Sequence, residues 1–210
     1  YIRYKGLMMF EHSLKKVINS KLFKLIILVI SKSHRKYMKY FNNEKVKIIY
    51  GGNKRHKSSL FALKYAKKFK PSKVIIHDAA RPDFSLKLLK KLVDLSKRYK
   101  CIIPYIKPVN SLKLKHKKKI INLNRSNIYE TQTPQCFDFN SVYNLSIKNK
   151  KIITDESSLF LNNNLKVNFI NGEENNKKIT NKSDLIANEI INYGIGFDVH
   201  RLVPNRRLYL

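Results

Sequence analysis

The sequence predicts an α/β fold in which a doubly wound, mostly parallel sheet carries helices on both of its faces. Two observations lead to this prediction: short β-branched and aliphatic segments recur along the chain, and segments with helical periodicity separate them. With 210 residues, of which 43% are hydrophobic, the chain is long and apolar enough to enclose a core. The same composition excludes a wholly disordered chain.

The expected strands are apolar segments that are short enough to be buried parallel strands. They cover residues 24–30, 45–50, 73–76, 101–105 and 167–170. The longest uninterrupted aliphatic run, 25–30, falls far short of the ~20 residues that a membrane-crossing helix needs. We therefore expect no membrane partner.

Helical patterns occupy the segments between and after these strands. They cover residues 58–69, 85–99, 137–147, 155–161 and 183–191. In the second of these segments, Leu88, Leu89 and Leu92 fall on one face, as in an amphipathic helix. Ser85 and Thr154 stand where the side chain of an N-cap residue would accept a hydrogen bond from the first turn of a helix.

The pattern changes over residues 107–135, where two short segments, 111–115 and 120–123, flank a basic tip that begins at His116. This pattern predicts a two-stranded arm. Because an isolated ribbon is marginally stable in water, we expect the arm to pack on something else, such as a second copy of the chain. The alternation of strand and helix then resumes, and we expect this domain to end at residue 193, where a new pattern begins.

The chain is strongly basic, with 44 Lys and Arg against 14 Asp and Glu and a formal net charge of +30. Such a charge could indicate a nucleic-acid-binding face. The lysines, however, are spread over every segment among many Asn and Ile residues, which favours a compositional bias. Salt-sensitive, weak binding to polyanions is expected in either case, and no specific nucleic-acid partner is expected.

Cysteine content bears on the compartment. The chain has two cysteines, Cys101 and Cys136, which is too few for a disulfide framework and fits a reducing environment. No signal-peptide pattern is present at the start of the sequence. These observations predict a cytoplasmic protein.

Polar clusters follow three of the predicted elements, at positions where open α/β sheets bind ligands. The first is GGNKRHKS at 51–58, where Gly51 and Gly52 would let the backbone approach a ligand and Ser58 would cap the next helix. An ordinary tight turn is the alternative. The sequence has no phosphate-loop consensus and no Gly-x-Gly-x-x-Gly, which disfavours a P-loop NTPase or a dinucleotide dehydrogenase.

The second cluster is HDAARP at 77–82. A carboxylate at the end of a strand, as Asp78 would be, can hold Mg²⁺ through one or two oxygens while phosphates supply the other ligands. The alternative is a local ion pair between Asp78 and Arg81. The third cluster, NRSNIYETQTPQ at 124–135, is a polar stretch for which no structural rule accounts.

Together with TDESS at 154–158 and NNKKIT at 175–180, these clusters resemble the 2-C-methyl-D-erythritol 4-phosphate cytidylyltransferase family of non-mevalonate isoprenoid synthesis. The resemblance runs over residues 1–193 and implies a Rossmann-like fold of the nucleotidyltransferase type with a protruding β-arm. The tail GIGFDVHRLVPNRRLYL, 194–210, resembles the first strand of 2-C-methyl-D-erythritol 2,4-cyclodiphosphate synthases, which some bacteria fuse behind the cytidylyltransferase. We therefore expect a piece of a bifunctional protein, clipped at both ends.

The resemblance implies that the enzyme transfers a cytidylyl group from CTP to 2-C-methyl-D-erythritol 4-phosphate, with Mg²⁺ as cofactor and pyrophosphate as leaving group. The residues that match nucleotide contacts of the family are Gly52, Asn53, Ser58, Asp78, Ala79 and Arg81, of which Asp78 would also hold Mg²⁺. Arg125 and Lys178 match the cations that position the methylerythritol phosphate, and Ser111, Thr133 and Thr154 match further contacts to that substrate.

The arm, at about 107–127, matches a segment that crosses to the other subunit of a homodimer in this family. On that basis Ser111 and Arg125 would complete the neighbour's site. Asn53 and Asn175 stand where the family has acidic residues, and Ser111 stands where it has threonine. These departures keep hydrogen-bonding groups but remove two charges.

The family's Gly-rich nucleotide loop and its charge-stabilising lysine would precede Tyr1. Because the loss of one preorganised donor costs about 10²–10³ in rate, we expect the 210-residue chain to be almost inactive and its full-length parent to be active. In the tail, Asp198 and His200 would share one face of a strand and could bind a divalent metal such as Zn²⁺. The synthase family needs another histidine further along, so no stable metal site is expected here.

Two alternatives remain open at this point. A cytidylyltransferase for another polyol phosphate, such as ribitol 5-phosphate, would share the HDAARP-like features, although the synthase-like tail argues against it. A basic nucleic-acid-binding module would leave ETQTPQ and Asp78 without a role.

Overall fold

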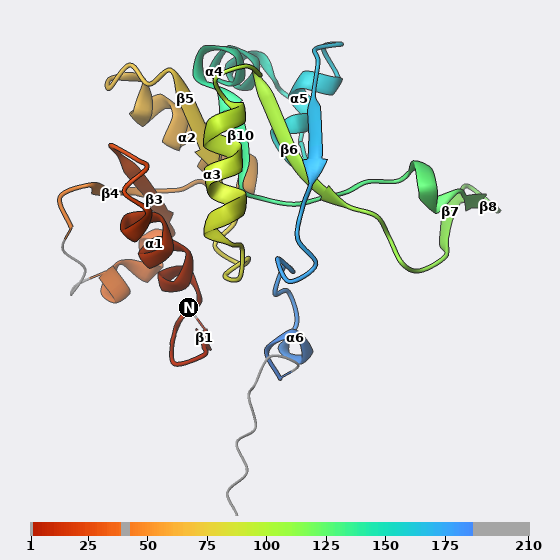
Figure 1. Cartoon of the computed structure of the whole chain (residues 1–210), viewed down its shortest axis with the longest axis horizontal. Coiled ribbons are helices and arrows are strands. Elements are labelled where there is room, and N and C mark those ends of the chain that lie inside the picture. The colour runs from red at the N-terminus through yellow and green to blue at the C-terminus, as the bar shows by residue number, and fades with distance from the viewer. Residues whose placement is uncertain (1, 39–42, 187–210) are drawn as a thin grey trace, which may run out of the picture.

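In the computed structural model of the chain, which describes residues 2–38 and 43–186, helices cover both faces of a mixed sheet (Figure 1). The sheet contains β5 (Lys73–Ile76), β6 (Cys101–Ile106), β9 (Glu130–Thr131), β10 (Gln135–Asp138) and β11 (Asn168–Asn171). Its order is β11-β6-β10-β5, with β9 paired to β6. A separate parallel pair is formed by β3 (Ile26–Ile30) and β4 (Val46–Tyr50).

The α/β fold is confirmed, and two strands, β9 and β10, run against the other three. β11 is parallel to β6, whereas β10 is antiparallel to both β5 and β6, so that β5, β6 and β11 share one direction. The predicted helix at 137–147 was wrong at its start, since 135–138 is strand β10 and α4 covers Phe139–Lys148. Asp138 ends the strand and caps α4, because its carboxylate accepts a hydrogen bond from the backbone N–H of Ser141 at 3.0 Å.

Alternation along the central strands divides the core into two clusters. Ile102 of β6 packs with Leu88, Leu89 and Leu92 of α3 (Leu86–Leu95) on one face. Ile103, the next residue, belongs to the cluster on the other face, which is built from α2 (Arg55–Lys67), α4 and α5 (Ser157–Leu161). Side chains that alternate about a strand serve both faces in this way, and the doubly wound arrangement follows.

Helix caps decide where several elements begin. Ser85 caps α3 as predicted, since its hydroxyl accepts from the N–H of Leu88 at 3.0 Å. Thr154 does not cap α5; instead Asp155 accepts from the N–H of Ser158 at 3.2 Å. The carboxylate is charged and reaches the first turn directly, which explains why it takes the place predicted for threonine.

The N-terminal region contains elements that the sequence patterns did not predict. They are β1 (Arg3–Tyr4), β2 (Leu7–Met8), α1 (Met9–Ser20) and the 3₁₀ helix η1 (Lys32–Met38). Glu11 accepts a hydrogen bond from the N–H of Met8 at 2.8 Å and so stabilises the start of α1. Lys16 of α1 donates to the carbonyl of Pro82 at 3.0 Å, which fixes α1 against the loop after β5.

The predicted arm is present as the hairpin β7 (Leu112–His116) and β8 (Lys119–Leu123), which extends away from the body (Figure 1). A short 3₁₀ helix, η2 (Arg125–Asn127), leads back to the sheet. Apolar side chains on this excursion are exposed, among them Val109 at 76% and Ile120 at 71%.

The last described element is α6 (Lys182–Ile186), which covers the beginning of the helix predicted at 183–191. The rest of that helix and the whole tail, with Asp198 and His200, lie outside the described residues. Within the described ranges, no helix combines the length and apolar character that a membrane crossing requires.

Candidate functional site

Asp78 lies in the loop after β5 and joins segments that are distant in the sequence. Its Oδ1 accepts a hydrogen bond from Nε of Arg55, the first residue of α2, at 2.9 Å. Its Oδ2 lies 3.4 Å from Nζ of Lys178, in the segment after β11. The alternative of a local ion pair with Arg81 is therefore not what the structure shows, because Asp78 pairs with two cations from elsewhere.

Arg55 extends this cluster to the start of α5. Its Nη1 donates to Oε2 of Glu156 at 3.0 Å, and the Glu156 side chain is only 1% exposed. Charges thus alternate along Glu156, Arg55, Asp78 and Lys178, which together carry no net charge. Burial alone would raise the pKa of Asp78, but Arg55 and Lys178 outweigh burial and hold that pKa below its ordinary value.

A hydrogen bond to Thr133 holds the backbone of Asp78 in place. The Thr133 hydroxyl accepts from the N–H of Asp78 at 3.0 Å and lies 3.2 Å from Nδ1 of His77. Nε2 of His77 lies 3.0 Å from the carbonyl oxygen of Arg81. Since a carbonyl can only accept, Nε2 carries the proton and Nδ1 accepts from Thr133. Thr133, expected as a substrate contact, is 4% exposed and has its hydroxyl in this network.

Arg81 ties the Asp78 loop to the segment that carries Lys178. Its two Nη atoms donate to the carbonyl of Asn176 at 2.7 Å and to the carbonyl of Thr131 at 3.3 Å. The N–H of Ile179 donates to the carbonyl of Ala80 at 2.8 Å. Arg81, expected as a nucleotide contact, therefore uses its guanidinium within this chain to hold the position of Lys178.

The polar stretch ETQTPQ has a structural explanation. Gln132 is 2% exposed and exchanges two hydrogen bonds with the backbone of Glu173, at 2.8 and 3.0 Å. A Cβ at Gly172 would lie 2.4 Å from Oε1 of Gln132, so glycine is what lets the two segments approach. Gln135 donates to the carboxylate of Asp155 at 3.0 Å. These buried side chains attach the segments around 155 and 173 to the sheet.

The Gly-rich turn packs on its own helix. A Cβ at Gly51 would lie 2.5 Å from Oγ of Ser58, and one at Gly52 would lie 2.6 Å from Cβ of Lys57. The prediction that Ser58 caps this helix was wrong, because α2 already begins at Arg55. The Ser58 hydroxyl instead accepts from the N–H of Gly52 at 3.2 Å and holds the turn closed. Asn53 is exposed beside it.

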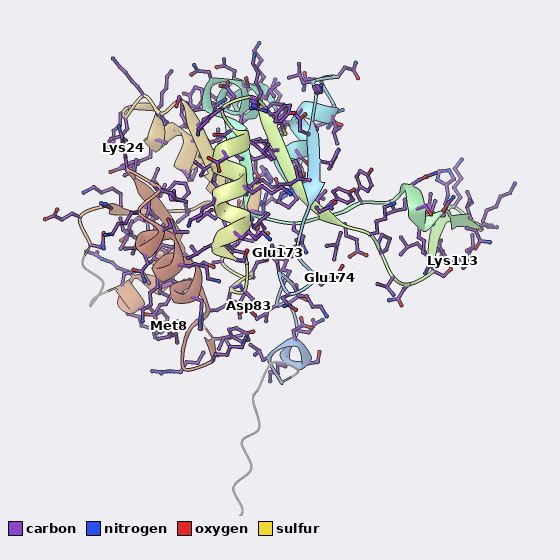
Figure 2. The ribbon with its side chains drawn as sticks, viewed as in Figure 1. Met8, Lys24, Asp83, Lys113, Glu173 and Glu174 are labelled. Carbon is purple, nitrogen blue, oxygen red and sulfur yellow. The ribbon has the colours of Figure 1, made fainter. Side chains whose placement is uncertain are left out.

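The remaining expected substrate contacts are exposed. Thr154 lies two residues before Glu156, with its hydroxyl 3.5 Å from that of Ser158. Ser111 and Arg125 lie on the excursion that carries the arm, where Arg125 donates to the carbonyl of Val109. Figure 2 shows Lys113 out on the arm, whereas Asp83 and Glu173 lie together on the body. Among the described residues, the cations paired with Asp78 are Arg55 and Lys178, and Arg125 is not one of them.

Four residues of this site were not singled out from the sequence: Arg55, His77, Asp155 and Glu156. Arg55 and Glu156 stand within the quoted segments GGNKRHKS and TDESS, but no local pattern indicates that they meet. The available signal was that each of these two segments contains a charged residue, Arg55 in the first and Glu156 in the second.

A comparison with known protein families shows which family this chain belongs to. The model of the family described as 2-C-methyl-D-erythritol 4-phosphate cytidylyltransferase matches residues 1–193. The chain belongs to this family. Both the resemblance seen in the sequence and the expected nucleotidyltransferase fold are thereby confirmed.

Relatives of this chain include fused and unfused proteins. It is 44% identical over 210 residues to the bifunctional enzyme IspD/IspF of Pelagibacter ubique, covering 100% of this chain and 57% of that protein. It is 36% identical over 199 residues to a 2-C-methyl-D-erythritol 4-phosphate cytidylyltransferase of Clostridium beijerinckii, covering 90% of this chain and 87% of that protein. The chain thus spans little more than half the length of its bifunctional relative.

Solved structures agree with this assignment. A 4-diphosphocytidyl-2C-methyl-D-erythritol synthase from Anaerococcus prevotii superposes with a TM-score of 0.82 at 30% identity, covering 89% of this chain and 86% of that one. The bifunctional IspDF of Campylobacter jejuni superposes with a TM-score of 0.72 at 28% identity, covering 85% of this chain and 45% of that one.

Proposed function

We propose that this chain is the part of its protein that transfers a cytidylyl group from CTP to 2-C-methyl-D-erythritol 4-phosphate, with release of pyrophosphate. The observation that carries the proposal is the cluster at Asp78, where Arg55 and Lys178 converge from distant segments in a chain of this family. Ordered cations and a carboxylate at the end of a sheet suit a reaction between two phosphates.

In the proposed arrangement, the nucleotide lies along the Gly-rich turn and the loop after β5. Its proposed contacts are Gly52, Asn53, Ser58, Asp78, Ala79 and Arg81. Lys178, whose side chain is 43% exposed, would bind the phosphate of methylerythritol phosphate. Because Arg81 and Ala80 already hold the segment around Lys178, the ammonium group would need little reorganisation.

The chemical step is an in-line displacement. An oxygen of the methylerythritol phosphate forms a bond to the α-phosphorus of CTP, and the bond from that phosphorus to the β-phosphate oxygen breaks, so that pyrophosphate leaves with the electron pair. The attacking phosphate is already ionised, so no general base is required. What this chain supplies is position and positive charge, from Lys178 and the loops around Asp78.

The donor set at Asp78 fits Mg²⁺. The ion prefers hard oxygen ligands and is commonly held by one or two carboxylates together with substrate phosphates, and Oδ2 of Asp78 has the Lys178 ammonium at 3.4 Å as its ion-pair partner, whereas Oδ1 accepts from Arg55. Bound there, Mg²⁺ would neutralise charge on the triphosphate. Within residues 2–38 and 43–186, no group of three or more His, Cys, Asp and Glu side chains could hold a metal on its own. Asp78, whose carboxylate lies at the proposed nucleotide site, is the proposed protein ligand.

A homodimer joined through the arm is part of the proposal, with Ser111 and Arg125 reaching the site of the other copy. The arm's exposed apolar side chains support it, since an isolated hairpin has no core in which to bury them.

Replacing Ile120 with aspartate is expected to weaken the dimer. Ile120 is 71% exposed on β8, and a charge in an apolar contact disfavours association. Light scattering across a concentration series should show a dimer for the wild type and monomers for Ile120→Asp, with cytidylyltransferase activity falling together with the dimer. Lys118→Glu, at the tip of the same hairpin, is the control and should remain dimeric. If Ile120→Asp dimerised like the wild type, the proposed role of the arm in the dimer would be wrong.

We also propose that residues 194–210 begin a cyclodiphosphate synthase domain in which Asp198 and His200 bind a divalent metal such as Zn²⁺. The support is that the bifunctional relative is nearly twice as long as this chain. A cytoplasmic location is proposed on the cysteines, since Cys101 and Cys136 are both free and buried.

The function is tested with the complete gene product that carries this sequence. Pyrophosphate release from CTP should be faster with 2-C-methyl-D-erythritol 4-phosphate than with ribitol 5-phosphate by at least tenfold in kcat/KM. A preference for ribitol 5-phosphate would replace the proposed substrate by the alternative polyol phosphate. If no pyrophosphate were released with either acceptor, the proposed function would be wrong.

A further inference from the structure

Glu156 is a buried charge that the proposed reaction does not use. Its side chain is 1% exposed, Oε2 accepts from Arg55, and Oε1 is buried with no hydrogen-bond partner among the residues that the structure describes. Burying a carboxylate is unfavourable unless it is well paired. The helix that it precedes does not need it as a cap, because Asp155 supplies that hydrogen bond. Glu156 therefore requires another explanation.

Arg55 stands between Glu156 and the reaction site. Its Nη1 donates to Glu156 at 3.0 Å and its Nε donates to Oδ1 of Asp78 at 2.9 Å. Since a guanidinium is planar and rigid, fixing one nitrogen fixes the direction in which the others point. Glu156 thus sets the orientation of Arg55, and Arg55 holds Oδ1 of Asp78. The other oxygen, Oδ2, is left toward Lys178.

The position of Arg55 at the start of α2 is electrostatically unfavourable, which gives its ion pair with Glu156 a second role. The first turn of α2 contains no acidic residue, and Arg55 places its cation at the positive end of the helix dipole. The two carboxylates offset this unfavourable position. Without Glu156, the full charge of Arg55 would fall on Asp78, which would then be less available to a metal ion or to Lys178.

We propose that Arg55 is a positioning residue for Asp78 and that Glu156 is the anchor that holds Arg55 in place. This inference rests on the proposed function, because it assigns Asp78 to the binding of the nucleotide with its metal ion. The competing explanation is that the pair only fastens α2 to α5. The two explanations differ in what happens to nucleotide use when the fold is kept.

The test uses Arg55→Lys and Glu156→Gln in the complete gene product. Each should raise the KM for CTP and the Mg²⁺ concentration for half-maximal rate by about 10- to 100-fold, since a misplacement of about 1 Å can cost that much. The KM for methylerythritol phosphate should change less than threefold. Asp94→Asn on α3, which breaks the exposed ion pair of Asp94 with Lys97, is the matched control and should leave all three values unchanged.

A double variant, Arg55→Met with Glu156→Met, separates positioning from folding. Removing both charges should restore most of the melting temperature that a change at Arg55 alone would cost, because position 156 no longer buries an unpaired carboxylate and Asp78 keeps Lys178 as a partner. The KM for CTP should stay raised. Recovery of both the melting temperature and the KM would show a structural pair and overturn the inference. Folded single variants with wild-type KM values would do the same while leaving the proposed function intact. If the wild-type protein released no pyrophosphate, both the proposed function and this inference would be wrong.

Discussion

Asp78→Asn is expected to lower kcat/KM for CTP in the complete gene product by about 10²- to 10³-fold, the usual cost of losing one preorganised charged group at a reacting phosphate. The amide keeps the size of the side chain and an oxygen that can accept from Arg55. It removes the charge that faces Lys178 and that would hold Mg²⁺.

The fold should survive this change. The backbone of Asp78 is held by Thr133, and Arg55 keeps Glu156 as a partner. Pyrophosphate release is the measurement, with a melting curve to show that the variant is folded. Asp94→Asn, on the exposed face of α3, serves as the control. Activity of Asp78→Asn within threefold of the wild type would mean that this carboxylate takes no part in the reaction.

The fold is expected to lose about 3 kcal/mol of stability through His77 as the pH falls from about 6.5 to about 4. Burial lowers the pKa of His77 to about 4, although Asp78 and the carbonyl of Arg81 act in the opposite direction. Over this range the unfolded chain binds a proton at His77 and the folded chain does not. Protonation therefore favours unfolding, and stability rises again as the pH is raised.

Urea unfolding at pH 7.5 and pH 4.5 measures this effect. His77→Gln should be less stable at pH 7.5 but should show a flatter dependence on pH, since the ionisable group is gone. His116→Gln, on the exposed arm, should keep the wild-type dependence. If His77→Gln lost as much stability between the two pH values as the wild type, the buried neutral histidine would not be the cause.

Much of the fold could be predicted from local patterns. Apolar segments of strand length indicated β3 to β6, the stripe of leucines indicated α3, and two short segments on either side of a basic tip at His116 indicated the arm. The helix predicted to begin at residue 137 was wrong at its start, because two local signals compete there. The apolar pair Cys136 and Phe137 suits either a strand or the start of a helix, and the pairing of β10 with β5 and β6 decides for the strand.

The candidate site was predictable in part. Strand-end position and residue type indicated Asp78, and the resemblance indicated Lys178, and the structure brings these two together. Arg55 and Glu156 are 101 residues apart, and no periodicity connects them. Similarly, the sequence shows that Thr133 and Arg81 are polar but not that both are used inside the chain to hold other residues. Contacts of this kind depend on tertiary packing.

The central claim is that Asp78 and Lys178 act in one site on one reaction. The most direct test is a double-mutant cycle with Asp78→Asn and Lys178→Gln, with kcat/KM for pyrophosphate release measured in the complete gene product. Because the two side chains lie 3.4 Å apart, the loss in the double variant should be smaller than the product of the two single losses by about tenfold or more. Losses that multiply, or a single variant that keeps wild-type activity, would contradict the claim.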